Sequence, residues 1–169
     1  GEGACFLVAP PGRELRPALT GWFAGFESLA EAQSMRVGYD EGGARFLGAT
    51  FEPTPLYRFN AVCDLYEEEG LTIGSVHAHV KALQARFLEH VESGAAGPFR
   101  SDELVPSTPH PRGHFLTFRR TDAQALQRSM AEARIITDAR GDRLRFGFGL
   151  YHTSVAVDAL ADRLGRLPG

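Results

Sequence analysis

Hydrophobic residues recur at helical spacing in the middle of the chain. Between residues 55 and 69 the apolar side chains fall three or four positions apart, and the same spacing continues from 73 to 93. Thr54 supplies a capping residue before Pro55, which suits the first helical position, and Thr72 can cap the second segment. The pattern therefore predicts helices near 55–69 and 73–93.

Strand-like and helical segments alternate in the last third of the chain. Short apolar runs indicate strands, while Thr121 with Gln124 is typical of a capping box and Thr153 can cap a last helix. After residue 72 these signals predict the order α-β-α-β-β-α, with helices layered against a small sheet, and therefore an α/β fold. The expected strands are 114–118, 134–137 and 143–148, the expected helices run to about 133 and about 164, and a turn is expected at 139–142.

Three other stretches lack a helical period. The apolar run 4–9 predicts a buried strand, whereas residues 12–53 are irregular, and a loop of that length is often functional. The segment 94–113 is rich in proline and glycine and is predicted to be a loop.

Composition narrows the class of protein. The 169 residues suffice for roughly one domain with a real core, and 43% hydrophobic with 23% charged residues excludes a disordered chain. No apolar run reaches the roughly 20 residues that span a bilayer, so no membrane segment is expected, and no signal peptide is recognisable. Cys5 and Cys63 are too few for a disulfide framework, which favours a reducing, cytoplasmic setting.

Charged residues exclude further classes. Seventeen arginines and one lysine, Lys81, are scattered along a chain of net charge −3, so no nucleic-acid partner is expected. His77 and His79 lie two apart on a predicted helix and so face different sides, and His90 has no carboxylate at a fitting spacing. No metal site is therefore expected.

Arg145 is the first candidate site residue. It stands in an apolar strand whose alternate residues, Leu144 and Phe146, face the other side. A permanent cation in such a place needs an anion. Two interpretations fit: an edge-strand arginine paired with an internal carboxylate such as Asp142, or a bidentate clamp for the carboxylate of a substrate.

Trp22 and Thr50 form a second candidate site. A tryptophan in a loop commonly serves packing, yet its indole N–H can also donate to a phosphate. Gly48 would let the backbone approach a ligand closely, with the hydroxyl of Thr50 as a further donor.

Four segments together resemble consecutive parts of class V aminotransferase-type enzymes, most nearly the kynureninase branch. They are GEGACFLVAPPG, LTGWFAGFE, ARFLGATFEPTPLYRF and DRLRFGFGLYHT. The resemblance implies the C-terminal portion of a fold type I enzyme that depends on pyridoxal phosphate. Residues 1–72 would then end the large cofactor-binding domain, and residues 73–169 would form the small C-terminal domain.

The resemblance also implies roles for single residues. Arg145 matches the arginine that binds the α-carboxylate of an amino-acid substrate. Thr50 and Trp22 match residues that reach the cofactor phosphate from the neighbouring subunit of a homodimer with a shared active site. Phe51 follows Thr50 where kynureninases place a residue of the substrate pocket.

The Schiff-base lysine of the family would precede Gly1, and Lys81 cannot replace it because it lies in the middle of a predicted helix. The missing N-terminal half is therefore an expected partner, and the chain alone is expected to be inactive. The implied reaction is hydrolytic cleavage between Cβ and Cγ of kynurenine-type substrates. Alternatives are a cysteine desulfurase, a selenocysteine lyase or an aminotransferase of the same superfamily, and a non-catalytic binding or assembly module. The absence of cysteine after Cys63 argues against a desulfurase, and the LYHT segment lacks the proline common in kynureninases.

Overall fold

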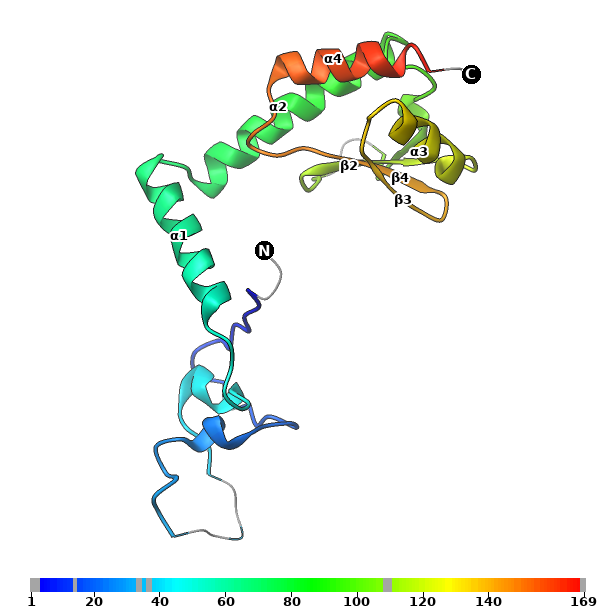
Figure 1. Cartoon of the computed structure of the whole chain (residues 1–169). Coiled ribbons are helices and arrows are strands. Elements are labelled where there is room, and N and C mark those ends of the chain that lie inside the picture. The colour runs from blue at the N-terminus through cyan, green and yellow to red at the C-terminus, as the bar shows by residue number, and fades with distance from the viewer. Residues whose placement is uncertain (1–3, 14, 33–34, 36–37, 108–110, 168–169) are drawn as a thin grey trace. The chain divides into compact units, whose positions relative to one another are not determined.

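The computed structural model describes residues 4–13, 15–32, 35, 38–107 and 111–167 of the chain. It divides into two compact units, Gly1–Glu69 and Gly70–Gly169. Helix α1 belongs to the first unit, and the sheet with helices α2, α3 and α4 belongs to the second (Figure 1). No helix within the described ranges is both long enough and apolar enough to cross a membrane.

The first unit is mostly irregular, as its sequence predicts. Two short 3-10 helices, η1 (Trp22–Gly25) and η2 (Gly42–Phe46), precede helix α1 (Thr54–Glu68). This helix confirms the one predicted near 55–69, but it begins at Thr54 instead of using that residue as its cap. The hydroxyl and N–H of Thr54 both donate to the carboxylate of Glu52, and they lower the pKa of Glu52.

The strand predicted at 4–9 is wrong, because residues 4–9 have no strand structure. Phe6, Leu7 and Val8 are exposed. A strand must pair its backbone groups with a neighbouring strand, and the described residues of the first unit contain none. The apolar run alone could not reveal that missing partner.

The second unit combines three helices with a four-stranded antiparallel sheet in the order β1-β2-β4-β3. The α-β-α-β-β-α order and the α/β fold class are confirmed, with one short strand added inside the segment predicted to be a loop. Along the chain the elements are α2 (Ile73–Glu92), η3 (Ser101–Glu103), β1 (Leu104–Val105), β2 (Phe115–Arg119), α3 (Ala123–Glu132), β3 (Asp138–Arg140), β4 (Arg143–Gly147) and α4 (Ser154–Leu164).

Caps explain where two of these helices begin. The Thr72 side chain accepts a hydrogen bond from the N–H of Ser75 (3.0 Å), and the Thr153 side chain accepts one from Ala156 (3.2 Å), as predicted. The capping box predicted at Thr121 is wrong, since α3 begins after Asp122 without a side-chain cap. The carboxylate of Asp122 instead accepts two hydrogen bonds from Arg120, of 2.8 and 2.9 Å.

The strand predicted at 134–137 is displaced and lies at Asp138–Arg140. Arg134 adopts a left-handed conformation (φ 58°) that turns the chain at the end of α3, and Ile135 is buried in the core. Pairing with β4 starts only after this turn. Gly141, with φ 57°, then forms with Asp142 the two-residue connection that joins two antiparallel strands.

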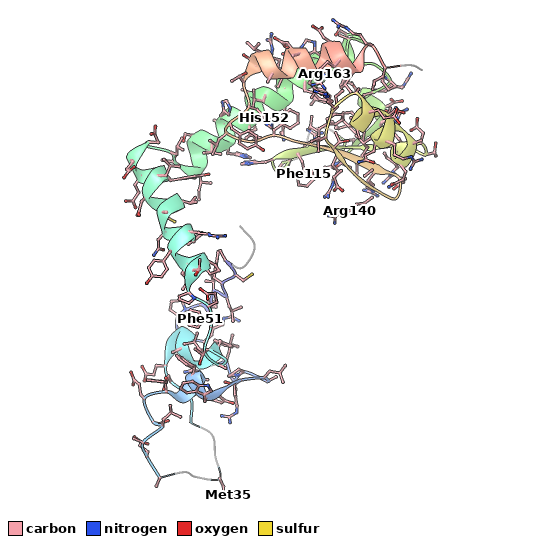
Figure 2. The ribbon with its side chains drawn as sticks, in the orientation of Figure 1. Met35, Phe51, Phe115, Arg140, His152 and Arg163 are labelled. Carbon is pink, nitrogen blue, oxygen red and sulfur yellow. The ribbon has the colours of Figure 1, made fainter. Side chains whose placement is uncertain are left out.

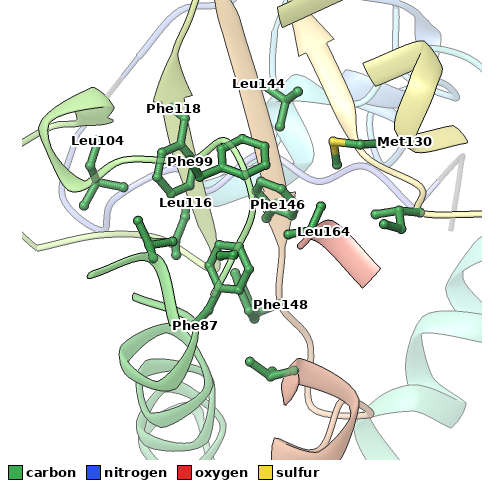
Figure 3. Close-up of a cluster of buried hydrophobic side chains, with 14 of the residues drawn as sticks. Phe87, Phe99, Leu104, Leu116, Phe118, Met130, Leu144, Phe146, Phe148 and Leu164 are labelled. Atoms are coloured by element: carbon green, nitrogen blue, oxygen red, sulfur yellow. The ribbon is translucent and has the colours of Figure 1, made fainter. Parts of the chain in front are cut away.

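The core lies between one face of the sheet and the helices. Leu116 and Phe118 from β2 and Leu144 and Phe146 from β4 point into it, where they join buried residues of all three helices (Figure 3). Phe87 of α2 is fully buried, and its ring centroid lies 5.0 Å from that of Phe146 and 6.4 Å from that of Phe118. The other face of the sheet has none of these helices against it.

An ion-pair cluster joins α2 to α4, which lie side by side (Figure 1). The Arg86 guanidinium donates two hydrogen bonds of 2.6 Å to the carboxylate of Asp158, and Nε2 of His90 lies 2.8 Å from the same carboxylate. Arg86 first, and then His90, lower the pKa of Asp158 from 3.8 to about 2.

We expect the D158N variant of the full chain to melt a few degrees below the wild type at neutral pH. The pKa of Asp158 is lower in the folded state than in the unfolded state. The contribution of Asp158 to the stability of the fold is therefore complete above pH 3.8 and disappears as the pH falls to about 2. The difference in melting temperature should therefore shrink over that range, as followed by circular dichroism. D162N is the matched control, one turn along α4 and without an ion pair among the described residues. An equal effect of both variants would contradict the assignment.

Candidate functional site

The open face of the sheet carries charge because alternate residues of each strand point there. Leu144 and Phe146 of β4 are buried in the core, so Arg143 and Arg145 face the other way. Phe115 and Arg140 extend from the side of the sheet opposite α2 and α4 (Figure 2). The alternation predicted around Arg145 is thus confirmed.

Four arginines on this face share two aspartates. Asp138 pairs with Arg145 and lies 3.4 Å from Nε of Arg140. Asp142 lies 3.7 Å from Nε of Arg119 and 3.6 Å from Nε of Arg143. Four positive and two negative charges leave a net charge of +2, so the face has capacity for a further anion.

Arg145 lies at the centre of this charge arrangement. It stands directly opposite Thr117 of β2 on one side and Asp138 of β3 on the other, so β4 is an inner strand and not an edge. Its guanidinium carbon lies 5.5 Å from the centre of the Phe115 ring, and its side chain is 30% exposed. The internal carboxylate that pairs with it is Asp138, so the predicted partner, Asp142, is wrong.

An open pocket of about 370 Å³ lies over the same face. Arg140, Arg143 and Arg145 line it together with Phe115, Thr117 and one carboxylate, that of Asp142. The combination of guanidinium groups with one aromatic ring suits a small organic anion, which needs charge at one end and an apolar surface beside it.

The first unit brings Trp22 and Thr50 onto neighbouring segments. The N–H of Phe23 donates to the carbonyl of Gly48 (3.0 Å), and Gly21 lies against the same carbonyl. Trp22 is 48% exposed and packs on Phe23, with ring centroids 4.4 Å apart. Neither the indole N–H of Trp22 nor the hydroxyl of Thr50 bonds to another residue in the described part of the chain.

These two donors could hold a phosphate group, since both are uncommitted and reach solvent from adjoining segments. Phe51, the residue after Thr50, carries an apolar ring and is 52% exposed (Figure 2). Arg145 belongs to the second unit and lies among the arginines of the sheet. The structure thus gathers the predicted residues in two separate groups.

His77, His79 and His90 of α2 each contact a residue from another part of the second unit. Nδ1 of His77 lies 3.3 Å from Nε2 of His114, and Nε2 of His79 lies 2.9 Å from the carbonyl oxygen of His152. His77 and His79 therefore point to different partners, as predicted. The carboxylate beside His90 is that of Asp158, which comes from another helix and so has no local spacing that the sequence could reveal. No cluster of three or more metal-ligating side chains occurs among the residues described.

Asp138 and Arg140 belong to this face but were not among the residues predicted from the sequence. A signal was available, because a two-residue turn at Gly141 and Asp142 pairs residue 140 with 143 and residue 138 with 145. Placing the strand at 134–137 concealed this register. The four arginines of the open face therefore looked scattered along the sequence.

Comparison with known proteins places the second unit in a family. A sequence model for the family described as kynureninase C-terminal domain matches residues 76–164, more than half of the chain. The match runs from the first turn of α2 to the end of α4 and includes Asp138 and Arg145. No curated protein matches the chain significantly.

We expect the G21A variant to separate the segments that carry Trp22 and Thr50. An added Cβ at Gly21 would lie 2.5 Å from the carbonyl oxygen of Gly48, closer than real Cβ atoms approach. Trp22 is the single tryptophan, so its emission should shift to longer wavelength as the indole loses contacts. G48A is the matched control, since its Cβ would meet no atom within 4 Å. Unchanged emission in G21A would disprove the close approach.

Proposed function

This chain belongs to the kynureninase C-terminal domain family, and on that basis we propose that it is the C-terminal part of a pyridoxal phosphate-dependent enzyme. The proposed reaction is hydrolytic cleavage between Cβ and Cγ of kynurenine-type amino acids. The proposal depends on the position of Arg145. This residue lies within the matched region, on a positively charged face with an open pocket.

Arg145 would bind the α-carboxylate of the substrate. A guanidinium forms two parallel hydrogen bonds with a carboxylate, which fixes both the position and the direction of the amino acid. Its place on an inner strand supports this role, because pairing on both sides holds the backbone at Arg145. Phe51 would supply an apolar wall for the aromatic part of the substrate.

Trp22 and Thr50 would hold the cofactor phosphate, from the neighbouring subunit of a homodimer. Their uncommitted donors on adjoining segments fit a phosphate group. When bound, pyridoxal phosphate accepts electrons from the substrate carbon skeleton. This chain would contribute the residues that anchor the phosphate and orient the substrate.

The lysine that carries the cofactor would come from a segment outside this sequence. Lys81, the single lysine, is exposed in the middle of α2. We therefore propose that the chain alone is inactive. Residues 1–72 would end the large cofactor domain, and residues 73–169 would be the small domain. Cys5 and Cys63 are free and exposed, in keeping with the proposed cytoplasmic setting.

Two other activities are separated by direct assay. A cysteine desulfurase or selenocysteine lyase would use a nucleophilic cysteine, but both cysteines lie in the first unit. An aminotransferase of the same superfamily and a non-catalytic module are the remaining alternatives. For a module, the exposed apolar side chains of α1, such as Phe59 and Val62, could serve assembly. Turnover of kynurenine, cysteine and selenocysteine by the intact enzyme distinguishes these functions.

In the intact enzyme, we expect R145A to raise KM for kynurenine about 10- to 150-fold. A hydrogen-bonded charged pair contributes about 1.5–3 kcal/mol, which corresponds to a change of that size. Steady-state kinetics measure the effect, and R166A, an exposed arginine beyond α4, is the control. An unchanged KM would disprove the carboxylate role.

We expect T50A to weaken binding of the cofactor more than turnover at saturating cofactor. Loss of one hydroxyl donor to a phosphate should cost about 1–2 kcal/mol, roughly 5- to 30-fold in cofactor affinity. Titration of the apoenzyme with pyridoxal phosphate, followed by the absorbance of the bound cofactor, measures the affinity. A loss of turnover with full cofactor affinity would contradict the assignment.

A further inference from the structure

Asp138 forms an ion pair with Arg145, whose guanidinium would bind the substrate carboxylate in the proposed function. We propose that Asp138 is an internal stand-in for the substrate carboxylate, which holds Arg145 until an amino acid displaces it and then stays with Arg140. This inference rests on the proposed role of Arg145. Asp138 is thus a positioning residue that sets the affinity for substrate through Arg145.

Strand register places these three residues together. Asp138 is directly opposite Arg145 in the β3–β4 pair, and Arg140 lies two residues along β3 on the same face. Asp138 contacts both guanidiniums, and Nε of Arg140 lies 3.4 Å from its carboxylate. A carboxylate with two cationic neighbours can leave one of them without losing its counter-charge.

The exchange avoids an unpaired charge at every stage. Before binding, Arg145 is paired with Asp138, and afterwards it is paired with the substrate while Asp138 remains beside Arg140. Removing a partner from a charged group without replacement is the costly event, and here it does not occur. The spare positive charge of the open face supplies the second partner.

The pair to be broken is weak enough to be displaced. The side chains of Asp138 and Arg145 are 48% and 30% exposed, and ion pairs accessible to water change an equilibrium by no more than about five-fold. The Phe115 ring, 5.5 Å from the guanidinium carbon, can support Arg145 during the exchange. The pocket beside Arg145 gives the incoming carboxylate its place.

Substitution in the intact enzyme tests the exchange. D138N keeps the shape of the side chain but removes its charge, so Arg145 becomes free, and KM for kynurenine should fall about two- to five-fold with kcat unchanged. D162N is the matched control, because it removes the same charge from α4, where Asp162 forms no ion pair among the described residues, and its KM should stay at the wild-type value.

The outcomes separate this inference from the proposed function. If R145A raises KM but D138N leaves KM unchanged or raises it, the stand-in role is overturned and the carboxylate role of Arg145 stands. If R145A leaves KM unchanged, the proposed function itself fails. A purely structural role of Asp138 would lower kcat or raise KM, which is opposite to the expected result.

A second measurement needs no catalysis. In the full chain labelled with ¹⁵N, the Nε–H signal of Arg145 can be identified by its absence in R145A, and sodium propionate serves as a simple carboxylate probe. We expect this signal to move at two- to five-fold lower propionate concentration in D138N than in the wild type, and at the wild-type concentration in D162N. The same concentration dependence in D138N and the wild type would overturn the inference.

Discussion

Strand β4 faces two ways, and the arrangement of the second unit depends on its register. Leu144 and Phe146 point into the core, whereas Arg143 and Arg145 point to the open face. A shift of one residue against its neighbours would exchange these sets, burying guanidiniums and exposing an aromatic ring. The contact of Phe146 with Phe87 therefore fixes more than the core, because it also keeps Arg145 opposite Asp138.

The second unit uses ion pairs in two different ways. Between α2 and α4, Arg86 and His90 both bind Asp158 at 2.6 to 2.8 Å, and this geometry holds two helices together. On the open face, two aspartates are shared among four arginines, so each guanidinium has only part of a counter-charge. Strong ion pairs between α2 and α4 hold the helices, whereas the shared ion pairs on the open face leave guanidiniums only partly neutralised. This combination would suit the proposed anion site.

The helices could be predicted from the sequence because their signals are local. Thr72 and Thr153 cap the helices that follow them, and both caps need only residues three positions away. The strands were less predictable, since a strand depends on a partner distant in sequence. The apolar run at 4–9 is not a strand, and the third strand begins four residues late because Arg134 turns the chain. The same dependence explains the candidate site. Arg145 could be recognised from its own strand, whereas Asp138 becomes visible only when the hairpin register is known.

The two edge strands of the sheet are short: β1 has two residues and β3 has three. Asp138 and Arg140 place opposite charges along the edge strand β3. An edge strand has unpaired backbone groups, and charged side chains on it disfavour pairing with a strand from another molecule. These side chains therefore protect the folded domain from aggregation by strand addition. A substitution that removes these charges would consequently affect solubility as well as the proposed binding of an anion.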